Sequence, residues 1–262
     1  MIKQVIKKIL PNTVIRILRM LIRRFKTFFH KGERYVCPFC NYSSKDLSPI
    51  GIDNFILKEK QIIGGGKRLG GCYKCGSSDR ERLIYIYLKE KMRLFSDKNK
   101  SILHIAPESL LSKKLLEFNF SEYVCGDLFP EGYSNYVKKI DILDIPYIDN
   151  TFDLIICNHV LEHIINDLDA MKELRRVLKL GGQAILQVPI SKNSPHTFED
   201  FSITDFKQRE SVFGQGDHVR IYGQDYIKRL ESSGFKVTKV NISDEFIKYG
   251  VNVDEDIFVC QK

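Results

Sequence analysis

The feature of this sequence that most constrains its fold is an alternation of apolar runs and helix-like segments over residues 80–262. Apolar runs of about four to eight residues are typical of buried strands, and apolar residues three and four apart are typical of helices. When the two kinds of segment alternate, successive strands run parallel and the helices pack on the sheet. The pattern therefore predicts an α/β domain whose ligands bind beyond the carboxyl ends of its strands.

Residues 80–92 are expected to form the first helix of this domain. The expected strands are residues 101–106, 123–126, 140–141, 152–157, 183–189, 235–240 and 256–260, and the later helices are residues 110–118, 160–180 and 226–233. This order predicts a Rossmann-like, mainly parallel sheet with helices on both faces. Residues 190–224 form a long polar and aromatic connector, which is predicted to be a substrate lid because such loops usually carry recognition.

Two Cys-x-x-Cys pairs, Cys37/Cys40 and Cys72/Cys75, precede this domain. Two such pairs bring four thiolates within tetrahedral reach of one Zn²⁺, and four protein ligands leave no open position, so the predicted zinc is structural. Residues 35–79 are therefore predicted to be a glycine-rich zinc ribbon that takes its folding energy from the metal. The alternative is four free thiols.

Three further cysteines lie in apolar, strand-like runs, where a thiol acts as a small buried hydrophobe. They are Cys125, Cys157 and Cys260. Because the total of seven cysteines is odd and no secretory signal is recognised, we expect a reducing, cytoplasmic compartment.

The net charge of +8 is concentrated in residues 1–34. This segment holds ten of the 41 Lys and Arg residues and one of the 33 Asp and Glu residues, so it carries +9 and the remaining 228 residues carry −1. Nucleic-acid binding needs cations spread over many phosphate contacts, which the neutral body lacks. An anionic partner is therefore expected to meet the N-terminal segment, and nucleic acid is not the expected partner.

Within this segment, residues 14–29 are predicted to form an amphipathic helix whose apolar positions span about 160° of a helical wheel. The apolar residues are Val14, Ile17, Leu18, Leu21, Ile22, Phe25, Phe28 and Phe29, and the cations are Arg16, Arg19, Arg23, Arg24 and Lys26. Pro11 separates it from a shorter predicted helix, Ile2–Leu10. Residues 1–30 are interpreted as an anchor on an anionic membrane surface. The alternatives are packing on the chain's own domain and nucleic-acid binding.

Three sequence blocks follow one another in the second half of the chain. They are Ile140-Asp141-Ile142-Leu143-Asp144-Ile145-Pro146-Tyr147-Ile148-Asp149-Asn150-Thr151-Phe152-Asp153, His159-Val160-Leu161-Glu162-His163-Ile164 and Arg176-Val177-Leu178-Lys179-Leu180-Gly181-Gly182. Together they resemble class I methyltransferases, which use S-adenosylmethionine. The first block is similar to the family segment D-x-x-x-L-P-F-x-D-x-S-F-D, and the other two follow in the family's order. The resemblance covers residues 101–262. When the zinc ribbon is included, the chain resembles type 11-like methyltransferases that are associated with bacterial surface glycans.

The resemblance implies which residues would hold the adenosine half of the cofactor. Asp127, at the tip of the second strand, would accept hydrogen bonds from both ribose hydroxyls, with Leu128 beside it. Asp141 would accept a hydrogen bond from the adenine amine, and Ile142 would pack on the ring. Taken singly, Asp127 or Asp141 could instead be a helix cap or a solvated turn.

The loop after the first strand departs from the family. Where the family has an acid and a glycine-rich loop, this chain continues from its strand into Ala106-Pro107-Glu108. Glycine lets a backbone approach a cofactor closely, and this turn is more rigid. Either Ala106 lines the cofactor and Glu108 meets its methionine ammonium, or the site has lost the cofactor. The adenosine-binding acids, with Asn158 and His159 after the fourth strand, favour the first interpretation.

The predicted lid holds the candidate catalytic and substrate-binding residues. Methyl transfer from a sulfonium needs an aligned acceptor and, for a hydroxyl, removal of its proton. His218 is the candidate base, with Asp217 near it, and Arg220 and Tyr222 are the candidate substrate-binding residues, Arg220 as an anion clamp. The alternative is that these residues hold the lid by hydrogen bonds. His163 is expected to cap or pack within its own helix.

These expectations together predict an S-adenosylmethionine-dependent methyltransferase, peripherally associated with the inner face of the membrane. The resemblance implies a surface-glycan or lipid-linked acceptor. Two alternatives remain open: an rRNA methyltransferase with a zinc module, and a non-catalytic membrane adaptor with a vestigial methyltransferase fold.

Overall fold

The computed structural model describes residues 12–262, so the shorter helix predicted over Ile2–Leu10 lies outside the described residues. Its centre is a seven-stranded sheet. The strands are β6 (Ser101–Ile105), β7 (Glu122–Asp127), β8 (Val137–Lys139), β9 (Phe152–Asn158), β10 (Leu178–Gln187), β14 (Lys236–Val240) and β15 (Ile257–Gln261). They lie in the order β14-β15-β10-β9-β6-β7-β8, parallel from β10 to β8, with β15 antiparallel to both of its neighbours. The predicted Rossmann-like, mainly parallel sheet is confirmed.

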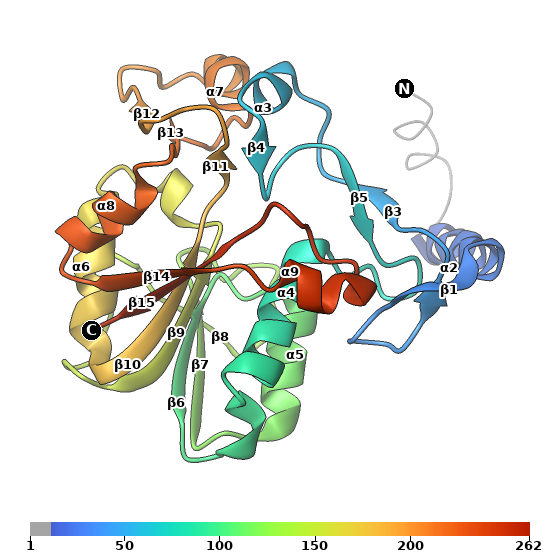
Figure 1. Ribbon diagram of the computed structural model, residues 1–262, viewed down its shortest axis with the longest axis horizontal. Helices are drawn as coiled ribbons and strands as arrows, with labels where there is room; N and C mark the ends of the chain where they lie inside the picture. Colours follow the sequence, from blue (N-terminus) through green and yellow to red (C-terminus); the bar gives the residue numbers. More distant parts are fainter. Residues whose placement is uncertain (1–11) are drawn as a thin grey trace.

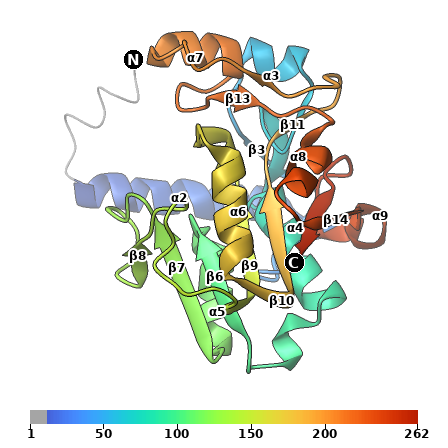
Figure 2. The same ribbon diagram turned by 90° about the vertical axis from the view of Figure 1, so that its left-hand side faces the viewer.

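Helices cover both faces of this sheet (Figures 1 and 2). On one face lie α4 (Asp79–Ile86), which continues as a π-helical turn over Tyr87–Lys91, and α5 (Ser109–Phe118). On the other lie α6 (Asp167–Val177) and α8 (Tyr226–Ser232). A sheet covered on both faces needs apolar side chains at successive strand positions, which is why its strands read as unbroken apolar runs.

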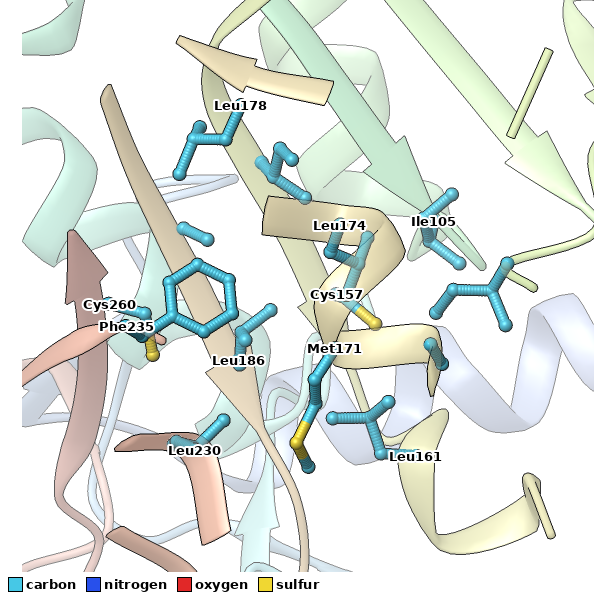
Figure 3. Packing of buried hydrophobic residues seen from close by; sticks show 14 of the residues in the cluster. Ile105, Cys157, Leu161, Met171, Leu174, Leu178, Leu186, Leu230, Phe235 and Cys260 are labelled. Carbon is cyan, nitrogen blue, oxygen red and sulfur yellow. The ribbon is translucent and has the colours of Figure 1, made fainter. Parts of the chain in front are cut away.

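Strand β9 shows how one run supplies two hydrophobic cores. Leu154 and Ile156 pack toward α4 and α5, whereas Ile155 and Cys157 pack toward α6 and α8, because successive side chains of a strand point to opposite faces. Figure 3 shows the second cluster, in which Cys157 lies close to side chains of α6. Full burial of one such aliphatic side chain stabilises the fold by about 1.5–3 kcal/mol, so the two clusters hold the layers together.

Two predicted elements differ from the structure. The third strand is Val137–Lys139 rather than residues 140–141, because Asp141 accepts a hydrogen bond from the Leu143 amide at 2.9 Å and turns the chain. The predicted helix over residues 160–180 is a 3₁₀ turn, Leu161–His163, followed by α6. Arg220 and Tyr222 of the lid both donate to the Leu161 carbonyl, which in a continuous α-helix would accept from the amide four residues on. The chain already enters β10 at Leu178.

The N-terminal module packs in two places: its ends lie around the paired cysteines, and its middle segment packs against the lid. Around the paired cysteines lie β1 (Lys31–Val36), β2 (Ser43–Ser44), β3 (Ser48–Ile50) and β5 (Arg68–Gly71), and β1 pairs with β2 and β3 with β5. The middle of the module instead joins the lid: α3 (Phe55–Glu59) packs on α7 (Phe206–Phe213), and β4 (Ile62–Ile63) pairs with β11 (Ile190–Ser191). The lid also contains the paired strands β12 (Phe198–Glu199) and β13 (Arg220–Ile221). Three short elements of the sheet domain complete it: 3₁₀ turns over Leu94–Ser96 and Ile247–Tyr249, and α9 (Ser243–Phe246).

A buried arginine fastens the module to the sheet domain. Arg82 of α4 is 1% exposed, and its guanidinium donates to the carbonyls of Ser77 at 2.8 Å and Gly70 at 2.9 Å in the module. It also donates to the carbonyls of Tyr249 and Gly250 at 2.6 Å each. Five N–H donors in a planar fork make arginine suited to joining several carbonyls from separate segments.

The helix α2 (Asn12–Phe29) leads into the module and leaves apolar side chains exposed. Its C-terminal turn is held by Tyr42, whose hydroxyl donates to the Thr27 carbonyl at 2.5 Å, and the His30 ring stacks on the Tyr73 ring at 3.8 Å. The exposed residues are Val14, Ile17, Leu18, Met20, Leu21, Ile22, Phe25, Phe28 and Phe29. Among residues 12–262, no helix combines the length and apolar character needed to cross a bilayer.

Candidate functional site

The carboxyl ends of the central parallel strands meet at one edge of the sheet. In register, Ile105 of β6 lies opposite Gly126 of β7 and Cys157 of β9, and Asn158 lies opposite Gln187 of β10. The chain passes from β6 to β7 on one side and returns to β9 on the other, so the order of strands reverses beside β6. Such a reversal leaves a crevice for ligands between the diverging connections.

Two residues at this edge have left-handed backbone conformations although they are not glycine. Ala106, directly after β6, has a φ of 47°, and His159, directly after β9, has a φ of 55°. This conformation costs a residue with a Cβ about 1–3 kcal/mol and tends to persist at functional sites. Ala106 thus adopts the backbone conformation for which glycine would be favoured, and its N–H donates to the Gly126 carbonyl at 2.8 Å.

The carboxylate of Glu108 is held across the strand ends. Its Oε2 lies 2.9 Å from Nε2 of His104 on β6, and its Oε1 accepts from the Asn158 amide of β9 at 3.0 Å. Burial alone would raise the pKa of Glu108, but the contacts with His104 and Asn158 together outweigh burial and lower the pKa. His104 is itself oriented by the hydroxyl of Tyr123, 2.8 Å from its Nδ1. The geometry therefore keeps an ionised carboxylate where the sequence predicted a cofactor contact.

Asp127 and Asp141 lie at the same edge in similar turns. Oδ1 of Asp127 accepts from the Phe129 amide at 2.8 Å, and Oδ2 accepts from the Tyr133 hydroxyl at 3.0 Å. Asp141 is exposed and accepts from the Leu143 amide. Each carboxylate oxygen has a second lone pair, so either acid can accept a further hydrogen bond from a ligand. The two apolar neighbours differ, because Leu128 is 39% exposed whereas Ile142 is buried in the core.

Asn158 provides the test of whether the edge fits an S-adenosylmethionine molecule. Its side chain is 6% exposed, and its Oδ1 has no hydrogen-bond partner among residues 12–262. A buried, unpartnered amide oxygen costs about 1–3 kcal/mol unless a ligand donates to it. The methionine ammonium of the cofactor is such a donor, with Glu108 supplying the opposite charge. The residues present therefore fit the cofactor.

The lid residue His218 lies inside the protein rather than at its surface. It is 3% exposed, and burial lowers its pKa to about 4, so the imidazole is neutral at neutral pH. Its ring is 4.7 Å from that of His163, at 88°. Asp217 interacts with His163 instead of His218, since the Nδ1 of His163 lies 3.1 Å from the Asp217 carbonyl oxygen. His163 thus contacts the lid, whereas the sequence had suggested contacts within its own helix.

Arg220 is fully buried, and its guanidinium is surrounded by partners from the protein. It donates to Glu199 at 2.8 Å and to the carbonyls of Leu161 at 2.9 Å and Ile165 at 2.8 Å, and it also contacts the Ile164 carbonyl. Because these contacts occupy the fork, Arg220 presents no open face to a substrate anion. The geometry favours the alternative in which the lid is held by hydrogen bonds.

Tyr222 belongs to the same buried network. It is fully buried, and its hydroxyl lies 2.5 Å from Oδ2 of Asp167, at the start of α6. Arg229 of α8 binds the same carboxylate through two hydrogen bonds of 2.7 Å and binds Glu199 at 3.0 Å. Tyr222 therefore joins the lid to the sheet domain, and its contacts are with protein groups.

The sequence reasoning missed a buried carboxylate at this edge, Glu162. It is 2% exposed, on the 3₁₀ turn after β9, with Oε1 3.5 Å from Nδ1 of His159 and 3.9 Å from Nε2 of His163. Burial opposes ionisation, but His159, His163 and His218 together lower the pKa of Glu162 to about 2. The available signal was an acid beside a histidine within an otherwise apolar stretch, which is typical of a buried polar site.

The four paired cysteines also converge. The Sγ atoms of Cys37 and Cys75 are 3.4 Å apart, those of Cys40 and Cys72 are 3.7 Å apart, and all four lie within 4.8 Å of one another. Four sulfurs bound to one Zn²⁺ at about 2.3 Å in a tetrahedron are about 3.8 Å apart. The cluster is therefore compatible with a zinc ribbon.

Comparisons with known proteins bear on the same region. Residues 108–186 match the family model described as "Methyltransferase domain". An uncharacterized protein of Methanocaldococcus jannaschii is 35% identical over 124 residues, which are 45% of this chain and 52% of that protein. The demethylmenaquinone methyltransferase of Staphylococcus carnosus is 25% identical over 201 residues, 71% of this chain and 74% of that enzyme.

Among solved structures, an S-adenosylmethionine-dependent methyltransferase from Archaeoglobus fulgidus is similar at 16% identity and a TM-score of 0.44, covering 71% of this chain and 95% of that one. The chain spans about half the length of the archaeal protein from M. jannaschii. Residues 108–186 are thus similar to methyltransferase domains, and they lie within a Rossmann-like, mainly parallel sheet.

A second buried acid near this edge, Glu255, leads to a prediction about pH. A Cβ on Gly64 would lie 3.2 Å from Oε1 of Glu255 and 3.3 Å from Cε1 of His159, so the three groups are neighbours. Burial first, and then Asp79, raises the pKa of Glu255 from 4.5 to about 7. Between these values the folded protein holds a proton that the unfolded chain has released, so stability falls as pH rises through this window.

We expect Glu255→Gln to remove that loss. The free energy of unfolding of the variant, taken relative to that of wild type, should rise by on the order of 3 kcal/mol from about pH 4 to about pH 8. Urea unfolding at both pH values measures this change. Glu231→Gln, at an exposed position of α8, is the control and should follow wild type. An unchanged difference between Glu255→Gln and wild type over this range would contradict a raised pKa.

Proposed function

We propose that this protein transfers the methyl group of S-adenosylmethionine to a hydroxyl or another nucleophile of a surface-glycan or lipid-linked precursor at the cytoplasmic face of a membrane. The observation that carries the catalytic part is the convergence of Glu108, Asn158 and Asp127 at the edge where the strand order reverses. A family match spanning residues 108–186 supports it.

Each half of the cofactor has its own residues in this proposal. Asp127 would accept from the ribose hydroxyls and the exposed Asp141 from the adenine amine. Glu108 and the free oxygen of Asn158 would receive the methionine ammonium, with Ala106 lining the loop. When bound, the cofactor supplies an electrophilic methyl group on a sulfonium, so the protein's task is to align the acceptor and exclude water.

The cofactor proposal is tested by titrating the full-length protein with S-adenosylhomocysteine in a calorimeter. Asp127→Ala should weaken binding on the order of 10- to 100-fold, because charge-assisted hydrogen bonds contribute about 1.5–3 kcal/mol each. Asp141→Ala should cost less, nearer tenfold. Glu108→Gln should also weaken binding, because it removes the charge opposite the ammonium.

The control is Asp97→Ala. Asp97 makes the same kind of turn, accepting from the Asn99 amide at 2.9 Å, but it precedes β6 at the opposite end of the sheet. It should bind like wild type. Wild-type protein that binds neither the cofactor nor its demethylated product at about 1 mM would overturn the methyltransferase proposal and favour the non-catalytic adaptor.

The proposal includes a structural zinc ion held by Cys37, Cys40, Cys72 and Cys75. We expect tag-free protein loaded with Co²⁺ to show thiolate-to-cobalt charge-transfer absorption, which Cys75→Ser should abolish while the sheet domain keeps its fold. Cys260→Ser, in β15, is the matched control and should retain the absorption. Wild-type protein without this absorption, and with the same melting curve with and without metal, would contradict the zinc ribbon.

The membrane part of the proposal rests on α2. Its side chains Phe25 and Phe28 are 64% and 76% exposed, although packing on the chain's own domain would have buried them. An exposed aromatic face with basic residues on the same helix suits an anionic lipid interface. The neutral body favours this partner over ribosomal RNA, since phosphate contacts require cations distributed over the surface.

Sedimentation with vesicles of phosphatidylglycerol and phosphatidylcholine tests the anchor. Deleting residues 1–30 should release the protein, and the double change Phe25→Ser with Phe28→Ser should weaken binding at least about tenfold, since each phenylalanine contributes about 1.5–3 kcal/mol when buried. Phe206→Ser, an exposed position of the lid, should bind like wild type. If the truncated protein still sediments with the vesicles, residues 1–30 are not the anchor.

A further inference from the structure

Three side chains with metal-ligating atoms converge outside the groups assigned to the cofactor. Glu162 and His163 lie on the 3₁₀ turn after β9, and His218 reaches them from the lid. One ligand atom of each lies within 4.8 Å of the others. Ligands of a divalent ion at about 2.1 Å in a tetrahedron are about 3.4 Å apart, so a small adjustment brings the three into coordination distance.

The hydrogen-bonding of Glu162 is incomplete without a further group. Its Oε2 is buried and has no hydrogen-bond partner among residues 12–262, and its side chain is 2% exposed. Both ring nitrogens of the adjacent His159 also lack hydrogen-bond partners within the described chain. Burying a carboxylate costs free energy unless each oxygen has a hydrogen-bond donor, a counter-charge or a metal ion beside it. A cation beside Glu162 would satisfy that oxygen.

The orientation of His163 points to the same conclusion. Its Nδ1 is 3.1 Å from the carbonyl oxygen of Asp217, which can only accept, so Nδ1 carries the proton in that contact. The lone pair of the neutral ring is then on Nε2, the nitrogen that lies 3.9 Å from Glu162. A histidine that ligates a metal through one nitrogen usually donates the other N–H to a carbonyl or carboxylate.

The lid fixes these groups relative to one another. The Val219 amide, next to His218, donates to the Glu162 carbonyl at 3.0 Å. Arg220, one residue further, donates to the carbonyls of Leu161 and Ile165 on either side of Glu162 and His163. Arg220 is therefore a positioning residue. Its buried contacts do not bind substrate. They hold the turn that carries Glu162 and His163 in a fixed position relative to the lid that carries His218, as one shared ion would require.

We propose that Glu162, His163 and His218 bind one divalent transition-metal ion, such as Zn²⁺, Mn²⁺ or Co²⁺, at the lid side of the carboxyl edge. Two imidazoles and one carboxylate are ligands that these ions accept. Three protein ligands leave a coordination position open, unlike the four-cysteine cluster. His159, whose Nδ1 is 3.5 Å from Oε1 of Glu162, faces the same space.

The open position suggests what the ion does, and this part rests on the proposed function. The ion would lie beside the residues that follow β9, where the acceptor meets the cofactor. A hydroxyl oxygen bound to the ion has a lowered pKa and is oriented by it. The expected acceptor class is therefore one that offers a hydroxyl or a diol oxygen as a metal ligand.

The test uses full-length, tag-free protein stripped of metal and titrated with Co²⁺ under equilibrium dialysis. Wild type should bind two ions per chain, one with thiolate charge-transfer absorption and one with visible ligand-field bands alone. Glu162→Gln and His218→Gln should weaken the second ion at least about 100-fold. They should keep the charge-transfer absorption, which also reports that the chain is folded. His196→Gln is the matched control, since His196 lies in the same lid with its side chain 86% exposed.

Two outcomes would overturn the proposal of a second ion. They are a wild type that binds one ion only, or Glu162→Gln and His218→Gln proteins that bind two ions as tightly as wild type. The first result would leave Glu162 as a partner of His159 alone. Calorimetry with S-adenosylhomocysteine separates this proposal from the proposed function, because loss of the ion should leave cofactor binding within about threefold of wild type. Cofactor binding without a second ion, or the reverse, identifies which proposal fails.

Discussion

The buried guanidinium of Arg220 makes the contacts on which the position of the lid at the carboxyl edge of the sheet depends. It joins the lid to the turn after β9, and it does so with Glu199 and with backbone carbonyls of that turn. Asp167 and Arg229 complete the network. Removing one partner from such a network typically costs about 3–5 kcal/mol, because the remaining buried charge is left unpaired. The network therefore determines one arrangement of lid and turn, which a purely apolar contact would determine less sharply.

The N-terminal module contributes to this arrangement as well as to its own cysteine cluster. Its middle segment supplies β4 and α3, which pack against the lid, and Leu57 of α3 lies so close to Gly214 that a Cβ on that glycine would be 2.3 Å from it. Arg82 ties the flanking segments to the end of the sheet domain. A metal at the cysteines would thus stabilise the lid indirectly. The segment between the two cysteine pairs packs on the lid, and a metal would fix both ends of that segment.

Charge is divided among three parts of the molecule with different surroundings. In the part of the chain that the structure describes, Arg23, Arg24 and Lys26 lie on α2 with its exposed aromatic residues, and residues 35–262 are close to neutral. At the sheet edge and lid, three carboxylates each have a basic neighbour: Glu108 with His104, Asp167 with Arg229, and Glu162 with His159. Burial makes such pairs selective for a single geometry, whereas Arg23, Arg24 and Lys26 of α2 are exposed.

The sequence by itself determined the layers of this protein. Apolar residues at a 3.6-residue period show which face of a helix is buried, and unbroken apolar runs show strands that are buried on both faces. It also determined the carboxyl edge, since the ends of parallel strands coincide whatever lies around them, and the pairing of four cysteines. It did not determine that the third strand ends before Asp141 or that residues 160–164 leave the helical path, because both follow from competing hydrogen bonds. Only the tertiary structure decided that Arg220 and Tyr222 are internal and that Glu162, His163 and His218 meet. His218 lies about 55 positions after Glu162 and His163 in the chain, and no local pattern records that the three side chains meet.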